Sequence, residues 1–282
     1  MRKHMTEGYY EQHQKLLQWE QNQPEYKAVQ DVLRRIREVR PLLERLSEQL
    51  APQFREGIYS AIISDDKSGR LPAVFLGKIA GHLSRDAGAK APTRIFVTGG
   101  HHLDVPEHRN QLHNYIRDLR AKGKVADRAL VVTEYMSTGI GIENIMRLFE
   151  KEGVACDVAA LSADKPLDAS NRGNEWESET SRRVRTTISG HELSPQEVLE
   201  TGPLAHQPFL FLGEQHGQGT GFSLYLTKEP TGVWGREDKP YSVRNLAARP
   251  EVVKASYRAI NKLADEVYEK YFAQQDDTAK AA

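Results

Sequence analysis

The amino-acid sequence predicts a three-layer α/β fold built on an open, mostly parallel sheet. A helical arm precedes this core, and an α+β extension follows it. The first observation behind this prediction is that short apolar runs alternate with segments of helical periodicity between residues 58 and 161. Strands that alternate with helices in this way indicate βαβ units and a parallel sheet. The second is that these runs are mainly continuous stretches of apolar residues, as is typical of strands covered on both faces. We therefore expect a sheet buried between two layers of helices.

Residues 1–52 form the predicted helical arm. From residue 8 to about residue 50, apolar side chains recur at steps of three and four among Gln, Glu, Arg and Lys, which is the period of an amphipathic helix. Because Pro24 and Pro41 each break or begin a helix, we expect two or three separate segments. The apolar stripe favours packing within the molecule or pairing in a homo-oligomer over nucleic-acid binding, since acidic residues interrupt the basic ones.

The predicted core, residues 53–215, holds the alternating elements in order. Strands are expected at 58–64, 93–98, 129–133 and 154–161, and helices at 71–84, 107–122 and 142–150. The polar stretch 162–205 predicts no defined element, and a further buried strand is expected at 208–213. The C-terminal extension, residues 216–282, closes with an amphipathic helix over 251–272.

Composition narrows the functional classes. The 39 Lys and Arg residues balance 39 Asp and Glu residues, so the net charge is zero. This balance argues against a general nucleic-acid binder but leaves room for a local phosphate site. The single cysteine, Cys156, cannot form an intramolecular disulfide and favours a reducing compartment. Because the first residues lack an apolar signal core and no apolar run reaches 18 residues, we expect a cytoplasmic protein without a membrane segment.

The turn after the third predicted strand carries the strongest chemical signal. In open α/β sheets, ligands bind beyond the carboxyl ends of the strands. Here the strand leads into Ser137, Thr138, Gly139 and Gly141, whose small size lets backbone amides close around an anion at the start of a helix. Glu134, just before them, is suited to accept hydrogen bonds from neutral hydroxyls. The pattern indicates a sugar phosphate, and the alternative is an ordinary capped turn between a strand and a helix.

This segment, residues 130–141, resembles the phosphoribosyl-diphosphate (PRPP) loop of type I phosphoribosyltransferases. In that loop several apolar residues precede two acids, two variable residues, two hydroxyl or small residues, and glycine. Aligned on residues 137–139, Glu134 occupies the second acidic position and Thr133 the first, so one of the two carboxylates that hold the ribose hydroxyls is replaced. The match therefore favours PRPP or nucleotide binding more strongly than catalysis. The PRPP and phosphate contacts that the resemblance implies are Thr133, Glu134, Met136, Ser137, Thr138, Gly139, Ile140 and Gly141.

The turn after the first predicted strand is similar to the diphosphate-binding loop of the same family. The resemblance implies that Ser68 and Gly69 offer backbone amides to a diphosphate, while Lys67 and Arg70 supply positive charge. It also implies that Asp65 and Asp66 hold Mg²⁺ through water. The implied catalytic residues are Glu134, Lys67 and Arg70. The alternatives are a solvated turn, and two aspartates that only cap the next helix.

The resemblance implies an enzyme of nucleotide metabolism, a glycosyltransferase that binds PRPP with Mg²⁺. It would transfer the 5-phosphoribosyl group to a nitrogenous base and release diphosphate. The replacement at Thr133 keeps open a second interpretation, a non-catalytic sensor of PRPP or a nucleotide that acts on a partner. A third is a structural interaction protein whose small-residue turn has no ligand, because a fold alone does not fix a function.

Overall fold

The computed structural model of the protein describes residues 24–65, 69–97, 106–136, 140–164, 188–193 and 250–273. Its centre is a five-stranded sheet in the order β2-β1-β3-β4-β5, and every neighbouring pair is parallel. The strands are β1 (Ala61–Asp65), β2 (Thr93–Val97), β3 (Arg128–Met136), β4 (Ala155–Asp164) and β5 (Ile188–Leu193). The predicted parallel α/β sheet is confirmed.

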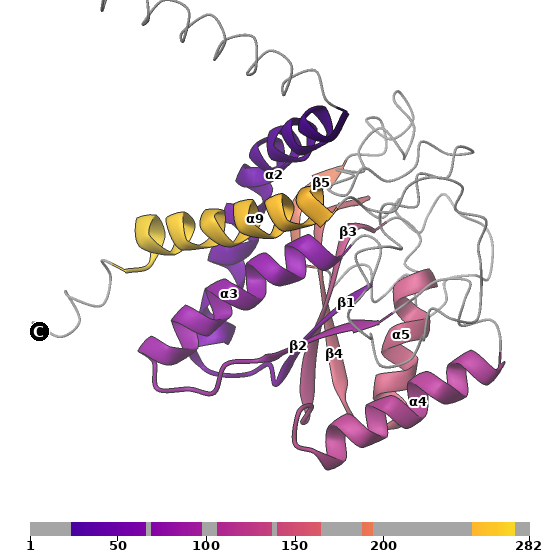
Figure 1. The fold of residues 1–282 in the computed structure, drawn as a ribbon. Coiled ribbons are helices and arrows are strands. Elements are labelled where there is room, and N and C mark those ends of the chain that lie inside the picture. Colours follow the sequence, from indigo (N-terminus) through magenta and orange to yellow (C-terminus); the bar gives the residue numbers. More distant parts are fainter. Residues whose placement is uncertain are drawn as a thin grey trace, which may run out of the picture.

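Helices cover both faces of this sheet, which gives the three predicted layers (Figure 1). The helices are α2 (Pro24–Arg55), α3 (Arg70–Asp86), α4 (Pro106–Ala121), α5 (Ile140–Lys151) and α9 (Pro250–Tyr271). Successive side chains of β3 point to opposite faces, as the pleat of a strand requires. Leu130 and Val132 pack under α2, α3 and α9, whereas Ala129 and Val131 pack under α4 and α5. The apolar runs of the sequence are therefore the result of burial on two sides.

The first described helix, α2, differs from the prediction because it is one continuous helix with Pro41 and Pro52 inside it. The expected break at Pro41 is wrong, whereas Pro24 is the first residue of α2. A proline in a helix removes one backbone hydrogen bond and costs about 3 kcal/mol. Pro41 lies on the exposed side of α2, where solvent can hydrate the carbonyl that loses its partner. Burial of the apolar side chains before and after Pro41 offsets this cost. These side chains are Ile36, Val39, Leu43, Leu46, Leu50 and Phe54.

The edge strand β5 was not expected, since it falls in the polar stretch 162–205. Gly190 explains how it fits. A Cβ at this position would lie 2.8 Å from the carbonyl oxygens of both Leu161 and Leu42, so only glycine lets β5 lie this close to β4 and α2. Arg45 of α2 donates a hydrogen bond to the Gly190 carbonyl at 2.9 Å. The α2 helix thus covers an edge strand that an apolar-run criterion does not detect.

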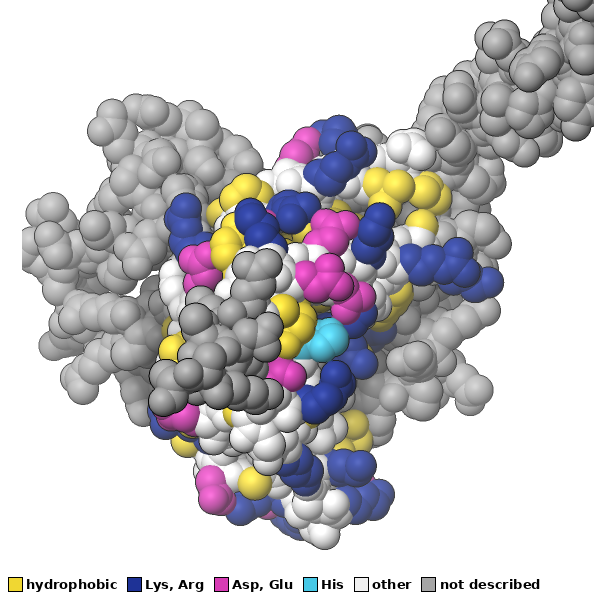
Figure 2. Space-filling view, turned by 90° about the vertical axis from the view of Figure 1, so that its left-hand side faces the viewer, with side chains coloured by type: hydrophobic (Ala, Val, Ile, Leu, Met, Phe, Trp, Pro, Cys, Tyr) yellow, Lys and Arg dark blue, Asp and Glu magenta, His cyan; other side chains and the backbone are white. Residues whose placement is uncertain are grey.

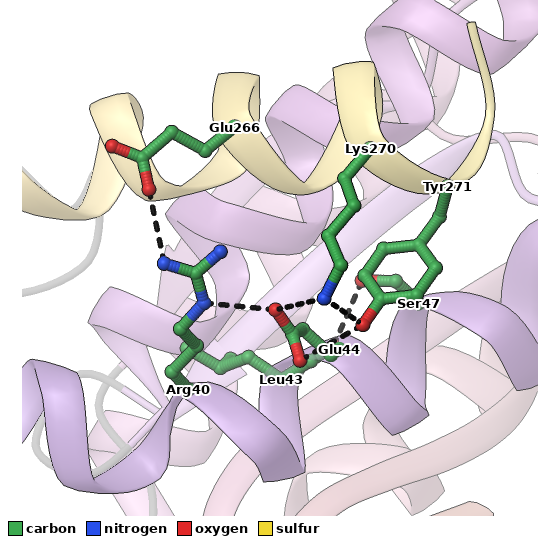
Figure 3. Close-up of polar contacts among 7 residues, drawn as sticks. All are labelled: Arg40, Leu43, Glu44, Ser47, Glu266, Lys270 and Tyr271. Carbon is green, nitrogen blue, oxygen red and sulfur yellow. Dashed lines mark hydrogen bonds and ion pairs between the residues drawn. The ribbon is translucent and has the colours of Figure 1, made fainter. Parts of the chain in front are cut away.

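The C-terminal helix α9 belongs to the same layer as α2 and α3. Its apolar face joins their hydrophobic cluster, and a polar network ties it to α2 (Figure 3). Glu44 accepts a hydrogen bond from Arg40 at 2.8 Å and another from the Tyr271 hydroxyl at 3.2 Å. Arg40 also pairs with Glu266 at 3.0 Å. These ion pairs and hydrogen bonds are partly exposed and therefore contribute little to the docking of α9. Buried apolar surface contributes more, and it comes from Ile260, Leu263, Ala264 and Val267.

A second polar set joins α9 to α3. Lys78 forms an ion pair with Asp265 at 2.5 Å, and the other oxygen of that carboxylate lies 3.1 Å from His82 Nε2. The His82 ring stacks on Tyr268 with 4.5 Å between centroids. Burial alone would raise the pKa of Asp265, but hydrogen bonds and charge from Lys78 and His82 outweigh it and lower that pKa.

On the side of the molecule seen in Figure 2, basic and acidic side chains are interspersed.

The remaining sequence predictions divide between confirmed elements and residues outside the described ranges. The helices expected at 71–84, 107–122, 142–150 and 251–272 are confirmed as α3, α4, α5 and α9. The strand expected at 208–213 and the residues before 24 lie outside the described residues. The domain division stays a prediction, although α2 continues past residue 52 to Arg55. Within the described ranges, no helix is long and apolar enough to cross a bilayer.

We predict that Asp265→Asn lowers the thermal midpoint at neutral pH, and that the deficit shrinks as the pH falls. A carboxyl whose pKa is lowered by folding contributes stability above its unfolded pKa and loses it as the pH falls through its folded pKa. Because the Asp265 side chain is 43% exposed, screening limits the contribution to about 0.5–1 kcal/mol.

Thermal unfolding between neutral and about pH 3 measures this effect. Asp118→Asn, which removes a 49% exposed carboxylate on α4, is the matched control for loss of a surface charge. A deficit in Asp265→Asn that does not change with pH would contradict the assigned role.

Candidate functional site

The order of the strands defines one preferred place for a ligand. From β1 the chain continues to β2 on one side, and from β3 it continues to β4 on the other. Such a reversal of strand order leaves a crevice beyond the carboxyl ends of the two central strands, where open α/β sheets bind ligands. The two turns predicted to contact PRPP follow these strands, β1 and β3. Their adjacency is a result of the structure, because the sequence alone gave no strand order.

The central strand β3 extends farther than its neighbour β1 at the carboxyl edge of the sheet. Pairing of β1 with β3 stops at Ser64 and Val132, but β3 continues to Met136 by pairing with β4. The predicted end of this strand at residue 133 is therefore too early, because β4 also runs on, to Asp164. Thr133 and Glu134 consequently lie on a part of β3 that extends past its pairing with β1. Each is only 2% exposed.

Gly69, at the start of α3, packs against β3 at Val132, where the pairing of β3 with β1 ends. A Cβ placed on Gly69 would lie 2.0 Å from the Val132 carbonyl oxygen and 3.1 Å from the Ser64 Cβ. The backbone conformation of Gly69 is right-handed helical, with φ −85°, so close approach and not backbone strain requires glycine here. This contact brings the N-terminus of α3 next to the residues that precede Thr133 and Glu134.

Ser64 adds an unusual polar group to the same place. Its side chain is fully buried, and its hydroxyl has no hydrogen-bond partner among the described residues. A buried hydroxyl without a partner is costly, by about 1–3 kcal/mol. The first turn of α3 carries no acidic residue, and Gly69 makes no side-chain cap. These features suit an acceptor-rich ligand at this helix end.

Arg70, predicted to contact a diphosphate, is the first residue of α3 and is enclosed. It is 1% exposed. Its guanidinium lies over the Phe96 ring, 4.4 Å from the centroid, and donates a hydrogen bond to the Tyr257 hydroxyl at 3.3 Å. Sequence reasoning found Arg70 but missed Tyr257, since a tyrosine in the stripe of a C-terminal helix carries no signal for a site.

The loop after β3 leads into α5, as expected. This helix begins at Ile140 and carries Glu143 in its first turn. Glu143 is 7% exposed and pairs with Arg147 at 2.5 Å. Met136, an implied phosphate contact, is buried in the cluster under α4 and α5. The sequence interpretation did not consider Glu143, whose charge would lie close to any phosphate at this helix end.

Several predicted site residues lie outside the described ranges. They are Asp66, Lys67, Ser68, Ser137, Thr138 and Gly139. Asp65, Ile140 and Gly141 are described in their backbone only. Asp65 follows the Ser64–Val132 pair and so lies at the register position next to Thr133. Their roles stay predictions.

The expected magnesium site requires donor groups, and the described residues provide few of them together. Among them, no group of three His, Cys, Asp or Glu residues could hold a metal ion. Mg²⁺ usually takes one or two carboxylates and keeps water or substrate phosphates as its other ligands. The position of Asp65 at the end of β1 fits this mode of binding. Magnesium binding stays a prediction.

We predict that Gly69→Ala destabilises the protein by about 1–3 kcal/mol, the range for overpacking a filled site. The added methyl group meets the Val132 carbonyl, which is backbone and cannot turn away. The matched control is Gly81→Ala in the same helix, where a Cβ would meet nothing within 4 Å.

The control should stabilise the protein by about 0.5–1 kcal/mol because alanine favours a helix interior over glycine. Urea denaturation measures both variants. Equal stability of Gly69→Ala and the wild type would show that this contact is not tight.

Comparisons with known proteins add little to this geometry. No protein-family model matches the sequence, and no curated protein matches it. Among solved structures, the chain is similar to the crystal structure of a purine phosphoribosyltransferase from Pyrococcus horikoshii Ot3. The identity is 17%, the match covers 55% of this chain and 89% of that one, and the TM-score is 0.29. A likeness at this level carries no information about function, so the described residues alone support the site.

Proposed function

We propose that the crevice beyond β1 and β3 binds PRPP with Mg²⁺, and that the protein is a phosphoribosyltransferase. The observation that carries this proposal is the adjacency of the two PRPP-like turns. They are separated by about 65 residues in the sequence, yet they follow neighbouring strands, and Gly69 of the first turn packs against Val132 of the strand that precedes the second. An extended ligand with a phosphate at one end and a diphosphate at the other requires two such turns.

Each part of the crevice has a proposed partner on the ligand. The amides of residues 137–141 and the N-terminus of α5 would receive the 5-phosphate. Glu134 would accept hydrogen bonds from the ribose hydroxyls, with Thr133 as a neutral second partner. Residues 66–70, at the N-terminus of α3, would receive the diphosphate. Ser64 would gain a partner for its buried hydroxyl from the ligand or its water.

The chemistry follows from this placement. A nitrogen of the acceptor base attacks the anomeric carbon, the carbon–oxygen bond to diphosphate breaks, and diphosphate leaves with the electron pair. Magnesium bound with the diphosphate supplies positive charge at the leaving group. Lys67 and Arg70 add to that charge, while the phosphate contacts far from the reacting carbon orient the sugar.

A second candidate, a non-catalytic sensor of PRPP or a nucleotide, is favoured by one observation. Thr133 is buried at the end of β3, in the position where the resembled family has its first acid, and it contributes no charge. A site with one carboxylate could bind the sugar while lacking the electrostatics for rapid transfer. The α9 helix, packed on α3, would then connect binding to a partner.

We predict that Glu134→Gln weakens PRPP binding in the presence of Mg²⁺ by about tenfold or more, the value for a hydrogen bond to a charged group. Isothermal titration calorimetry measures this affinity, and the thermal midpoint without ligand checks the fold. The matched control is Glu143→Gln, another buried carboxylate, in the first turn of α5.

The control should bind PRPP as well as the wild type or more tightly, because it removes a negative charge near the proposed phosphate. Equal affinity of Glu134→Gln and the wild type, together with a large loss of stability, would assign Glu134 a structural role instead.

Diphosphate release from PRPP with a panel of bases separates the two candidates. Release that depends on a base identifies a transferase. Stabilisation of the protein by PRPP without release favours the sensor, since binding alone raises the thermal midpoint.

A further inference from the structure

The C-terminal helix α9 reaches the candidate crevice by following α3 along its length. Tyr257 contacts Arg70 at the first residue of α3, and Tyr268 donates a hydrogen bond to Asp86 at the last. Between them, the Asn261 carbonyl accepts from Lys78 at 3.3 Å. The two helices therefore run side by side in the same direction (Figure 1). Their amino-terminal halves meet where the proposed diphosphate site begins.

Two of the groups that contact the Arg70 guanidinium are neutral. The Phe96 ring lies against its face, with 4.4 Å from the guanidinium carbon to the ring centroid. The Tyr257 hydroxyl accepts a hydrogen bond from Nη1 at 3.3 Å. The first contact sets the plane of the guanidinium, and the second sets its direction. An arginine side chain otherwise has about 2 kcal/mol of rotamer entropy to lose on ordering.

We infer that Tyr257 is a positioning residue of the proposed PRPP site, and that it acts through Arg70. This inference rests on the proposed function. Arg70 directly follows Gly69, which packs against Val132 of β3, so its position depends on the strand that leads to the second turn. A cation enclosed at the N-terminus of α3 would act on a diphosphate bound there by its charge, which is weakly screened in such surroundings. A residue that prevents this cation from moving away thereby strengthens ligand binding.

A purely structural role for Tyr257 predicts a different result. Docking of α9 depends on its apolar face, on Asp265 with Lys78 and on Tyr271 with Glu44. One more hydroxyl adds little to this docking. Tyr271 provides a matched comparison, since it is a tyrosine of the same helix whose hydroxyl also makes a hydrogen bond, but to α2. Both hydroxyls should contribute similarly to stability, whereas only that of Tyr257 lies beside Arg70.

The test compares Tyr257→Phe with Tyr271→Phe in the full-length chain. Calorimetry measures the affinity for PRPP with Mg²⁺ and for inorganic diphosphate with Mg²⁺, and thermal unfolding measures stability. We expect Tyr257→Phe to weaken both affinities by about tenfold, as for loss of a hydrogen bond to a charged group. Tyr271→Phe should leave them within about twofold of the wild type, and the two variants should lose similar, small amounts of stability.

A double-mutant cycle tests whether the effect passes through Arg70. Arg70→Met keeps the apolar stem against Phe96 and removes the guanidinium. In that background Tyr257→Phe should change the affinities by less than about twofold, because coupled residues are not additive. If Tyr257→Phe fails to fold, Phe96→Leu removes the other contact and should likewise weaken binding.

The outcomes that overturn the inference are distinct from failure of the proposed function. Equal affinities of Tyr257→Phe, Tyr271→Phe and the wild type overturn the role of Tyr257 while leaving the PRPP site intact. Additive effects of Tyr257→Phe and Arg70→Met overturn the route through Arg70. If the wild type itself binds neither PRPP nor diphosphate, the proposed function fails and this inference fails with it.

Discussion

The close contact between the Gly69 backbone and the Val132 carbonyl sets the geometry on which the candidate site depends. Any side chain at residue 69 would collide with a backbone atom of the central strand. The glycine lets the first turn of α3 approach the place where β3 passes the end of β1. This approach places the start of α3, where the first predicted ligand turn ends, against the strand that leads to the second. The contact therefore joins the topology of the sheet to the chemistry of its carboxyl edge.

Buried polar residues and buried apolar residues are distributed differently around this contact. Most of the buried residues on both faces of the sheet are apolar, whereas Ser64, Arg70, Thr133 and Glu134 are buried polar groups gathered at its carboxyl edge. Buried polar and charged groups are costly unless they are hydrogen-bonded or paired. The Ser64 hydroxyl has no hydrogen-bond partner among the described residues, and the proposed ligand would supply one.

The layer formed by α2, α3 and α9 gives the site support from distant parts of the sequence. Figure 3 shows α9 joined to α2 by Arg40, Glu44 and Glu266, and ion pairs of Asp265 join α9 to α3. The last described helix is thus packed along the helix that begins at Arg70.

Much of the fold could be predicted from local patterns, because apolar runs and helical periods are recorded in neighbouring residues. Continuity of α2 through Pro41 could not, since it depends on tertiary burial on either side. Strand β5 was not predicted because its sequence contains no apolar run. Its place beside β4 and α2 depends on a close backbone contact that Gly190 allows. For the site, motifs singled out Thr133, Glu134 and Gly69, and their part in ligand binding stays a prediction. The adjacency of β1 and β3 and the contact between Tyr257 and Arg70 required the folded structure.

A crystal structure of the protein with PRPP and Mg²⁺ tests the central claim most directly. The account predicts the sugar phosphate in the crevice between β1 and β3, with its 5-phosphate at the N-terminus of α5, its ribose hydroxyls against Glu134 and its diphosphate at the start of α3. A ligand bound elsewhere on the molecule, or a crevice filled by the protein's own side chains at saturating PRPP, would contradict it.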